Sequence, residues 1–249
     1  VLDVPYLGNE VLSFAAGMET VIMNDLFEKH NIPQAKYTSL RLYTWKENEE
    51  KAYEQVEKEI GYPCYVKPAN SGSSVGISKA ENRKELKKSF TEAFLYDTRL
   101  VIEEEIIGRE MQTSVVGNDN PKASLPGEFI MERSFFDYNA KYIDGKLIPV
   151  IPARLEPEVM DKVRETAVKV FKILNCYGLA RVDIFVTDDN KIYVNEVNTM
   201  PGFTAVSMTP VLWGATDGTT YPQLIEKLIE LAFERYEQKK SILSTRCTK

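Results

Sequence analysis

Two short segments that alternate between apolar and polar side chains constrain most strongly how this chain can fold. They run from Leu179 to Val186 and from Lys191 to Asn198, and the polar turn Thr187-Asp188-Asp189-Asn190 separates them. An alternation with a period of two is typical of a half-buried strand, and two such segments around a short turn predict a β-hairpin. The sequence therefore predicts a sheet in its C-terminal part.

Side chains that can bind a cation lie on this predicted hairpin. Arg181 and Asp183 share one face of the first strand, and Glu196 and Asn198 share one face of the second. Mg²⁺ that handles nucleotides is usually held by one or two carboxylates plus phosphate oxygens. The alternative is a solvated face with mixed charges. Apolar neighbours favour burial, which makes an unpaired carboxylate costly, so we interpret the hairpin as a nucleotide metal site.

Composition predicts an ordinary soluble protein that binds neither nucleic acid nor an anionic membrane surface. The 249 residues are 43% hydrophobic, and 37 acidic against 31 basic residues give a net charge of −6 without a long basic run. Cys64, Cys176 and Cys247 lie far apart without metal-binding spacing, which favours a reducing cytosol. No apolar stretch approaches the ~18 residues of a spanning helix. We expect a cytoplasmic protein.

Helix and strand patterns are mixed along the chain, and no repeat is present. Asn9 is expected to cap a helix that continues to about Phe27 and stops at His30-Asn31-Ile32-Pro33. Further helices are expected over about 46–60, 82–94, 157–174 and 221–240, and further strands over about 62–67, 100–105 and 110–117. The last two strands would be joined by a turn at Gly108. This order predicts an α+β fold with a boundary between about Leu95 and Glu104.

A lysine followed by a loop of small residues indicates a phosphate site. Lys67 ends a predicted strand, and the residues from Ala69 to Gly76 are small. Backbone N–H groups and hydroxyls on such a loop can surround phosphate oxygens while the ammonium group supplies charge. The spacing fits neither a Walker A loop nor a dinucleotide-binding motif. The alternative is a flexible glycine-serine turn.

Two other segments have the composition of ligand-binding loops. Phe135 to Tyr142 holds four aromatic residues with Asp137 and Lys141, which fits a closing lid or a loop packed on the core. Gly202, between Pro201 and Phe203, can offer an N–H to a developing oxyanion, or it belongs to a plain Pro-Gly turn. The only histidine, His30, is expected to be a solvated residue at a helix end. Serine-triad hydrolysis and His-based zinc chemistry are therefore poorly supported.

Four motifs, in this order, resemble those of the ATP-grasp ligases, and closely those of the D-alanine-D-alanine ligases of bacterial cell-wall synthesis. They are Val66-Lys67-Pro68 with Gly72-Ser73-Ser74-Val75-Gly76, Asp137-Tyr138 with Ala140-Lys141-Tyr142, Arg181-Val182-Asp183, and Asn195-Glu196-Val197-Asn198-Thr199 with Pro201-Gly202-Phe203-Thr204. The resemblance covers nearly the whole chain, from Pro5-Tyr6-Leu7-Gly8 to the final helix. It implies an α+β ATP-grasp fold in which two lobes clasp ATP, with 1–8 as a remnant of an N-terminal domain, 9–103 as a central lobe and 104–249 as a C-terminal lobe.

The resemblance also implies a reaction and assigns residues to it. ATP would phosphorylate the carboxylate of one D-alanine, and the amine of a second D-alanine would displace the phosphate, as in peptidoglycan precursor synthesis. The implied nucleotide contacts are Lys67, Ser73, Ser74, Glu103, Glu110 and Lys141, and the implied ligands of two Mg²⁺ or Mn²⁺ ions are Asp183, Glu196 and Asn198. Arg181 and the Gly202 N–H would stabilise the tetrahedral intermediate. Ser207 and Met208 would lie near the carboxylate of the second D-alanine.

Ser73 and Tyr142 match two members of a hydrogen-bonded set that closes the lid in this family. A tyrosine at position 142 points to a dipeptide product rather than a depsipeptide. The family tends to form dimers, so the resemblance also implies a homodimer. Its partners would be the small-molecule substrates ATP and D-alanine, and neither nucleic acid nor a membrane.

Two departures from the family pattern affect these expectations. The chain begins with Val-Leu-Asp-Val-Pro, roughly where the family's N-terminal domain ends, so we expect a segment upstream. Met18-Glu19 is followed by Thr20, where the family has a lysine, which removes one expected phosphate contact. Two alternatives therefore stay open: a nucleotide-binding fragment without turnover, and a D-amino-acid ligase with a different second substrate.

Overall fold

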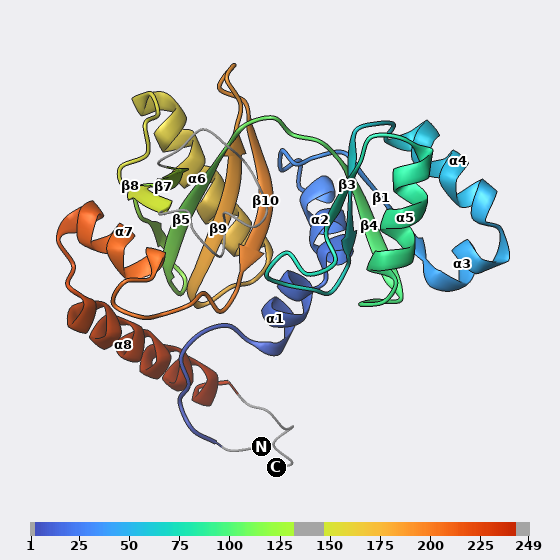
Figure 1. Ribbon diagram of the computed structural model, residues 1–249. Coiled ribbons are helices and arrows are strands. Elements are labelled where there is room, and N and C mark those ends of the chain that lie inside the picture. Colours follow the sequence, from blue (N-terminus) through green and yellow to red (C-terminus); the bar gives the residue numbers. More distant parts are fainter. Residues whose placement is uncertain (1–2, 132–146, 243–249) are drawn as a thin grey trace, which may run out of the picture. The chain divides into compact units, whose positions relative to one another are not determined.

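The computed structural model describes residues 3–131 and 147–242, and Figure 1 shows their helices and strands. Contacts divide the chain into two compact units. Unit 1 comprises Val1–Val11, Glu110–Asp183 and Val197–Lys249, and unit 2 comprises Leu12–Arg109 and Ile184–Glu196. The polypeptide mixes helices with antiparallel sheets, which confirms the predicted α+β class. The domain limits at 8/9 and 103/104 remain predictions.

Unit 2 is built on a four-stranded sheet in the order β1-β4-β2-β3. Its strands are β1 (Tyr37–Arg41), β2 (Cys64–Pro68), β3 (Ser78–Ala80) and β4 (Arg99–Glu104). One face is apolar and fully buried, because Cys64, Val66, Leu100 and Ile102 pack with residues of α4 (Glu49–Glu59) and α5 (Arg83–Ala93). Since side chains alternate between faces, Lys67 and Glu103 lie on the other face.

The first predicted helix is wrong in two respects. The segment forms two helices, α1 (Val11–Met18) and α2 (Thr20–Lys29), and they are interrupted at Glu19. Glu19 has an extended backbone, and its carboxylate accepts a hydrogen bond from Ile22 N at 2.7 Å, so it caps α2. Asn9 does not cap α1, because its side chain is committed to other parts of unit 1. His30 ends α2 and is exposed, as predicted.

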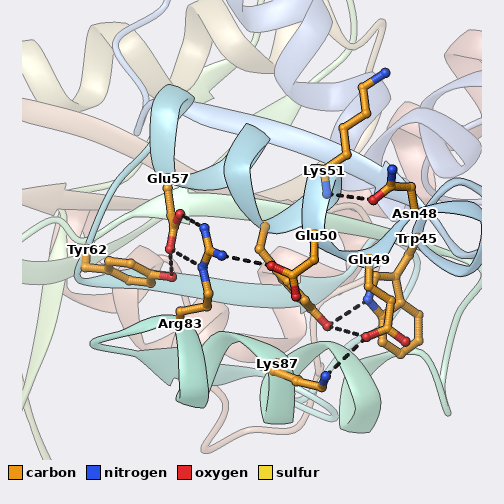
Figure 2. Close-up of polar contacts among 10 residues, drawn as sticks. Trp45, Asn48, Glu49, Glu50, Lys51, Glu57, Tyr62, Arg83 and Lys87 are labelled. Atoms are coloured by element: carbon orange, nitrogen blue, oxygen red, sulfur yellow. Dashed lines mark hydrogen bonds and ion pairs between the residues drawn. The ribbon is translucent and has the colours of Figure 1, made fainter.

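The predicted helix over 46–60 is also interrupted, into α3 (Leu42–Glu47) and α4. Asn48 has an extended backbone between them, and its side chain accepts a hydrogen bond from Lys51 N at 3.0 Å. Figure 2 shows this cap and the polar contacts that join α4 to α5. Arg83 donates to Glu57 and, at 2.9 Å, to Glu50, while Lys87 pairs with Glu49 at 3.4 Å.

Unit 1 contains most of a second sheet, whose strand order is β10-β9-β5-β7-β8, with β6 paired to β5. The strands are β5 (Arg109–Gly117), β6 (Lys122–Ala123), β7 (Gly127–Met131), β8 (Leu147–Val150), β9 (Gly178–Val186) and β10 (Ile192–Asn198). Its helices are α6 (Pro157–Ile173), α7 (Met208–Asp217) and α8 (Tyr221–Lys240). A core cluster joins β5 and β9 to α7 and α8 through Val116, Leu179, Trp213, Leu224 and Leu228.

The predicted hairpin, α5, α6 and α8 are present close to their expected limits. The predicted strands on either side of Gly108 are present as β4 and β5, but they belong to different sheets. Gly108 must be a glycine there, since an added Cβ would lie 2.8 Å from Val186 O. Sequence patterns gave no sign of α7, which carries an internal Pro210 and small residues.

Buried cysteines are chemically quiet in this fold. Burial raises the pKa of the Cys64 thiol to about 11 and that of Cys176 to about 12, so both stay protonated at neutral pH. Within 3–131 and 147–242, none of the helices combines the length and apolar character that a bilayer crossing requires.

Candidate active site

In unit 2, Lys67 and Glu103 form a buried ion pair on the polar face of the four-stranded sheet. Lys67 Nζ lies 2.6 Å from Glu103 Oε2, and the two side chains are only 19% and 9% exposed. The pair bridges the neighbouring strands β2 and β4. Lys67 on β2 lies opposite Val101 on β4, and Glu103 is two positions further along β4. An isolated carboxylate at this depth would be strongly destabilising, and the ammonium group compensates it. The sequence predicted both residues as nucleotide contacts but did not predict that they contact each other.

A polar chain continues behind Glu103. Asn24 Nδ2 lies 3.4 Å from Glu103 Oε1, and Gln34 donates to Asn24 O at 2.9 Å. Gln34 in turn forms a parallel bridge with Val194 of β10. Sequence analysis missed these two positioning side chains. The signal for Asn24 was available, because it is a polar residue on the apolar face of α2, between Met23 and Phe27.

The small-residue loop after Lys67 has a backbone suited to an anion. Ser73 and Ser74 both adopt the left-handed conformation, at φ 53° and 58°, and Gly76 follows at φ 74°. The loop is held by Asp97, which accepts a hydrogen bond from Asn70 N at 2.8 Å. Within the described part of the chain, the N–H groups of Ser73, Ser74 and Gly76 bond to no protein acceptor. Backbone N–H groups of this kind, in a turn with left-handed residues, can bind an anion such as a phosphate group.

Thr20 is the residue at which the resemblance predicted a lysine. Its N–H donates to Ala69 O at 2.8 Å, so the start of α2 is fixed to the base of the phosphate loop. Next to it, Arg99 pairs with Glu19 at 3.1 Å. The local backbone is thus held without a lysine side chain.

In unit 1, Arg181 and Asp183 form a second buried ion pair. Arg181 Nε and Nη2 each lie 2.7 Å from one oxygen of Asp183, and Asp183 is only 1% exposed. The two residues are two positions apart on β9, which confirms that they share a face. A bidentate contact of this geometry fixes the guanidinium plane as well as its charge.

The other two predicted metal ligands lie on β10, the strand beside β9. Glu196 is exposed, and the Asn198 side-chain oxygen accepts a hydrogen bond from Met200 N at 3.1 Å. Across the described residues, no group of three or more His, Cys, Asp or Glu side chains could hold a metal ion. The donor set of two carboxylates and one amide oxygen is nevertheless the hard oxygen chemistry that Mg²⁺ takes, with phosphate and water completing its shell. The residues therefore fit such an ion.

The segment after β10 places Gly202, Ser207 and Met208 at the start of α7. Gly202 is exposed, and an added Cβ there would meet only Ser207 Oγ, at 3.7 Å. Ser207 and Thr204 hydrogen-bond each other reciprocally through backbone and side chain. Because the Ser207 hydroxyl is used in this way, it does not cap α7. The first N–H groups of α7 are thus left for another acceptor.

Glu110 lies at the start of β5 and is half-buried. Lys141 and Tyr142, like the rest of the aromatic segment 135–142, lie outside the described residues, so their assignments remain predictions.

Comparison with known proteins identifies the family of this chain. A family model described as D-ala D-ala ligase C-terminus matches residues 26–230. This chain belongs to the D-alanine-D-alanine ligase family. Membership implies the use of ATP and confirms the α+β ATP-grasp fold.

Curated relatives named D-alanine--D-alanine ligase match nearly the whole chain. The protein from Bacillus cytotoxicus is 50% identical over 245 residues, which is 98% of this chain and 67% of that relative. The protein from Staphylococcus epidermidis is 50% identical over 240 residues, covering 96% of this chain and 67% of that relative. The chain thus spans about two thirds of the length of the curated relatives it matches.

Solved structures of the family are also similar. The D-alanine-D-alanine ligase from Coxiella burnetii superposes with a TM-score of 0.83 at 35% identity, over 96% of this chain and 63% of that one. The VanG D-Ala:D-Ser ligase from Enterococcus faecalis gives a TM-score of 0.82 at 34% identity, over 92% of this chain and 65% of that one.

Proposed function

We propose that this chain carries the nucleotide-binding and ligation machinery of an ATP- and Mg²⁺-dependent ligase that joins two D-alanines. The observation that carries the proposal is the bidentate Arg181–Asp183 pair on β9, because it sets a cation and a carboxylate in fixed orientation on one strand of a chain that is 50% identical to D-alanine--D-alanine ligases. A homodimer in the cytoplasm that supplies a peptidoglycan precursor is the physiological form we propose.

The reaction has two chemical steps. A carboxylate oxygen of the first D-alanine bonds to the γ-phosphorus of ATP while the bond from that phosphorus to the bridging oxygen of ADP breaks. The unprotonated amine of the second D-alanine then bonds to the acyl carbon, the carbon–oxygen bond to phosphate breaks, and the amine releases one proton to solvent. ADP, phosphate and the dipeptide are the products.

The residues of the two units divide the roles. Lys67 and the N–H groups of Ser73 and Ser74 bind phosphate oxygens, since an ammonium group and left-handed N–H groups favour negative charge. Glu103 and Glu110 contact the adenosine part. Asp183, Glu196 and Asn198 would hold Mg²⁺, which would supply charge neutralisation when it is bound. Arg181 and the Gly202 N–H stabilise the oxyanion of the tetrahedral intermediate.

Two assignments complete the site. Lys141 is proposed as a γ-phosphate contact, and Ser73 with Tyr142 as part of the hydrogen bonding that favours an amine nucleophile. The uncapped start of α7, with Ser207 and Met208, is proposed to receive the carboxylate of the second D-alanine, because helix N-termini favour anions.

D-serine as the second amino acid is the competing candidate. The similarity to the VanG D-Ala:D-Ser ligase, with a TM-score of 0.82 at 34% identity, supports this candidate. Sequence favours D-alanine, since the relatives at about 50% identity are named for two D-alanines. A chain that binds nucleotide without turnover is the third candidate.

Phosphate release measured with Mg²⁺-ATP and D-alanine separates these candidates. We expect release that depends on D-alanine and a product with the mass of D-alanyl-D-alanine. A mixture of D-alanine and D-serine, analysed by mass spectrometry, reports the second substrate. Bound ATP without D-alanine-dependent release would contradict the ligase activity and support the nucleotide-binding alternative.

A further inference from the structure

Asn9 is a fully buried side chain that joins three segments of unit 1. Its Nδ2 donates to Leu179 O and to Thr199 O, both at 2.8 Å, and its Oδ1 accepts a hydrogen bond from Tyr177 N at 2.8 Å. The residue is 1% exposed. Both amide hydrogens and the carbonyl oxygen of this side chain therefore form hydrogen bonds. Their partners lie 168 to 190 positions away in the sequence.

These bonds lie at the open end of the β9–β10 hairpin. Leu179 is near the start of β9, two positions before Arg181, and Thr199 directly follows Asn198 at the end of β10. The chain leaves the hairpin at Thr199 and enters the segment 199–207, which carries Gly202 and Ser207. Asn9 thus fixes the point from which this segment departs.

The segment before α1 is docked independently of Asn9. Glu10 pairs with Arg235 at 2.5 Å and with Lys239, and the Arg235 guanidinium lies 3.1 Å from the centre of the Tyr177 ring. Gly178, at φ +71°, lets the Gly8 backbone approach, since an added Cβ would lie 3.1 Å from Gly8 N. Figure 1 shows this segment, in blue, beside α8. These contacts fix the segment to unit 1 without using the Asn9 side chain.

Beyond Gly202, the segment 199–207 has further anchors. Tyr221 donates to Phe203 O at 3.0 Å and its ring packs on that of Phe203 at 5.6 Å, and Thr204 and Ser207 bond each other. On the β10 side, Met200 is 75% exposed, and the side chains that hold the backbone are Asn198 and Asn9. The position of the Gly202 N–H therefore depends on a buried bond from Asn9.

We propose that Asn9 is a positioning residue that holds the segment 199–207 in place for the second amino acid. The proposal rests on the proposed function for the role of Gly202 and Ser207. Asn9 itself touches no reacting atom, and acts through the carbonyl groups of Leu179 and Thr199.

The test combines hydrogen–deuterium exchange with kinetics on the whole chain. The variants are Asn9→Ser and Asn9→Ala, with Glu10→Gln as a control in the same segment and Val163→Ala as a control that destabilises the core through α6. We expect amides of 199–207 to exchange roughly 10-fold faster in both Asn9 variants, relative to the amides of β5, and at the wild-type ratio in both controls.

The kinetic measurements test whether the second D-alanine binds less well. In the Asn9 variants we expect the KM for the second D-alanine to rise roughly 10-fold, with Mg²⁺-ATP affinity unchanged, because only positioning of the amino-acid side is altered. Unchanged relative exchange of 199–207 in soluble, folded Asn9 variants would overturn the proposal. Faster exchange with an unchanged KM in an active enzyme would also overturn it. If wild type shows no turnover, the proposed function fails, and the exchange arm alone still decides whether Asn9 positions the segment.

Discussion

Two ion pairs of this protein each compensate the charge of a buried carboxylate, but their geometry differs. Lys67–Glu103 in unit 2 joins neighbouring strands through a single contact of 2.6 Å, whereas Arg181–Asp183 in unit 1 joins positions of one strand through two contacts of 2.7 Å. A lysine ammonium can rotate its three donors toward a new anion, while a planar guanidinium bound at both ends is held in one orientation. The first pair can therefore exchange its partner for a phosphate, whereas the second keeps the orientation in which Asp183 and Arg181 are proposed to meet a metal ion and an oxyanion.

The largest expected effect comes from breaking the fixed pair. Asp183→Asn leaves the Arg181 guanidinium half-buried beside a neutral amide, so we expect the free energy of unfolding to fall by about 3 to 5 kcal/mol. Urea denaturation measures it. The double variant Arg181→Met with Asp183→Leu removes both charges and should recover most of the loss. A loss below about 1 kcal/mol in Asp183→Asn would mean that the pair is not structural.

Breaking the exchangeable pair should cost less. In Lys67→Met, Glu103 keeps its contact with Asn24, so we expect the free energy of unfolding to fall by about 1 to 3 kcal/mol. The Glu103→Gln variant, which keeps the shape of the side chain, is the matched partner. Urea denaturation of both checks the value. A loss in Lys67→Met as large as that in Asp183→Asn would contradict the distinction between the two pairs.

A substitution at Gly202 is expected to lower activity without changing stability. Gly202→Ala adds a methyl group where only Ser207 Oγ lies within 4 Å, so we expect the free energy of unfolding to change by less than about 0.5 kcal/mol. D-alanine-dependent phosphate release should fall roughly 10- to 100-fold, because the methyl group displaces the reacting atoms from the N–H. Full activity in this variant would show that Gly202 belongs to an ordinary turn.

The smallest effect on stability is expected in the more exposed ion pairs of Figure 2, which join Arg83 and Lys87 to glutamates of α4. The hydrogen bonds from Arg83 hold the pKa of the Glu57 carboxyl below its usual 4.5. A lowered carboxyl pKa contributes stability above the unfolded pKa, and the contribution is lost as pH falls through the folded pKa. The melting temperatures of wild type and Glu57→Gln should therefore differ slightly at pH 7 and converge as the pH falls below the usual carboxyl pKa of 4.5. A difference in melting temperature that grows as the pH falls would contradict the stabilising role of the Glu57 carboxylate.

Sequence patterns predicted those parts of the fold and site that depend on local order. Alternation located β9 and β10, and the period of α6 and α8 located those helices within a few residues. The shared face of Arg181 and Asp183 followed from their spacing alone. These features need no information about distant segments.

Contacts between distant segments were beyond the same reasoning. Lys67 and Glu103 are 36 positions apart, and only the pairing of β2 with β4 brings them together. Asn9 has the sequence context of a helix cap, yet the bonds to Leu179 and Thr199 outweigh that local preference. The apolar residues of the first predicted helix continued across Glu19, so periodicity did not mark the interruption between α1 and α2.

The stabilisation of this chain by Mg²⁺-ATP tests the central claim most directly, because that claim is the presence of a nucleotide site that includes Lys67. A melting curve is recorded with and without Mg²⁺-ATP for wild type and for Lys67→Met. We expect wild type to gain about 2.7 kcal/mol at 100 times the Kd, and Lys67→Met to gain much less at the same concentration. An unchanged melting temperature of wild type in millimolar Mg²⁺-ATP would contradict the account.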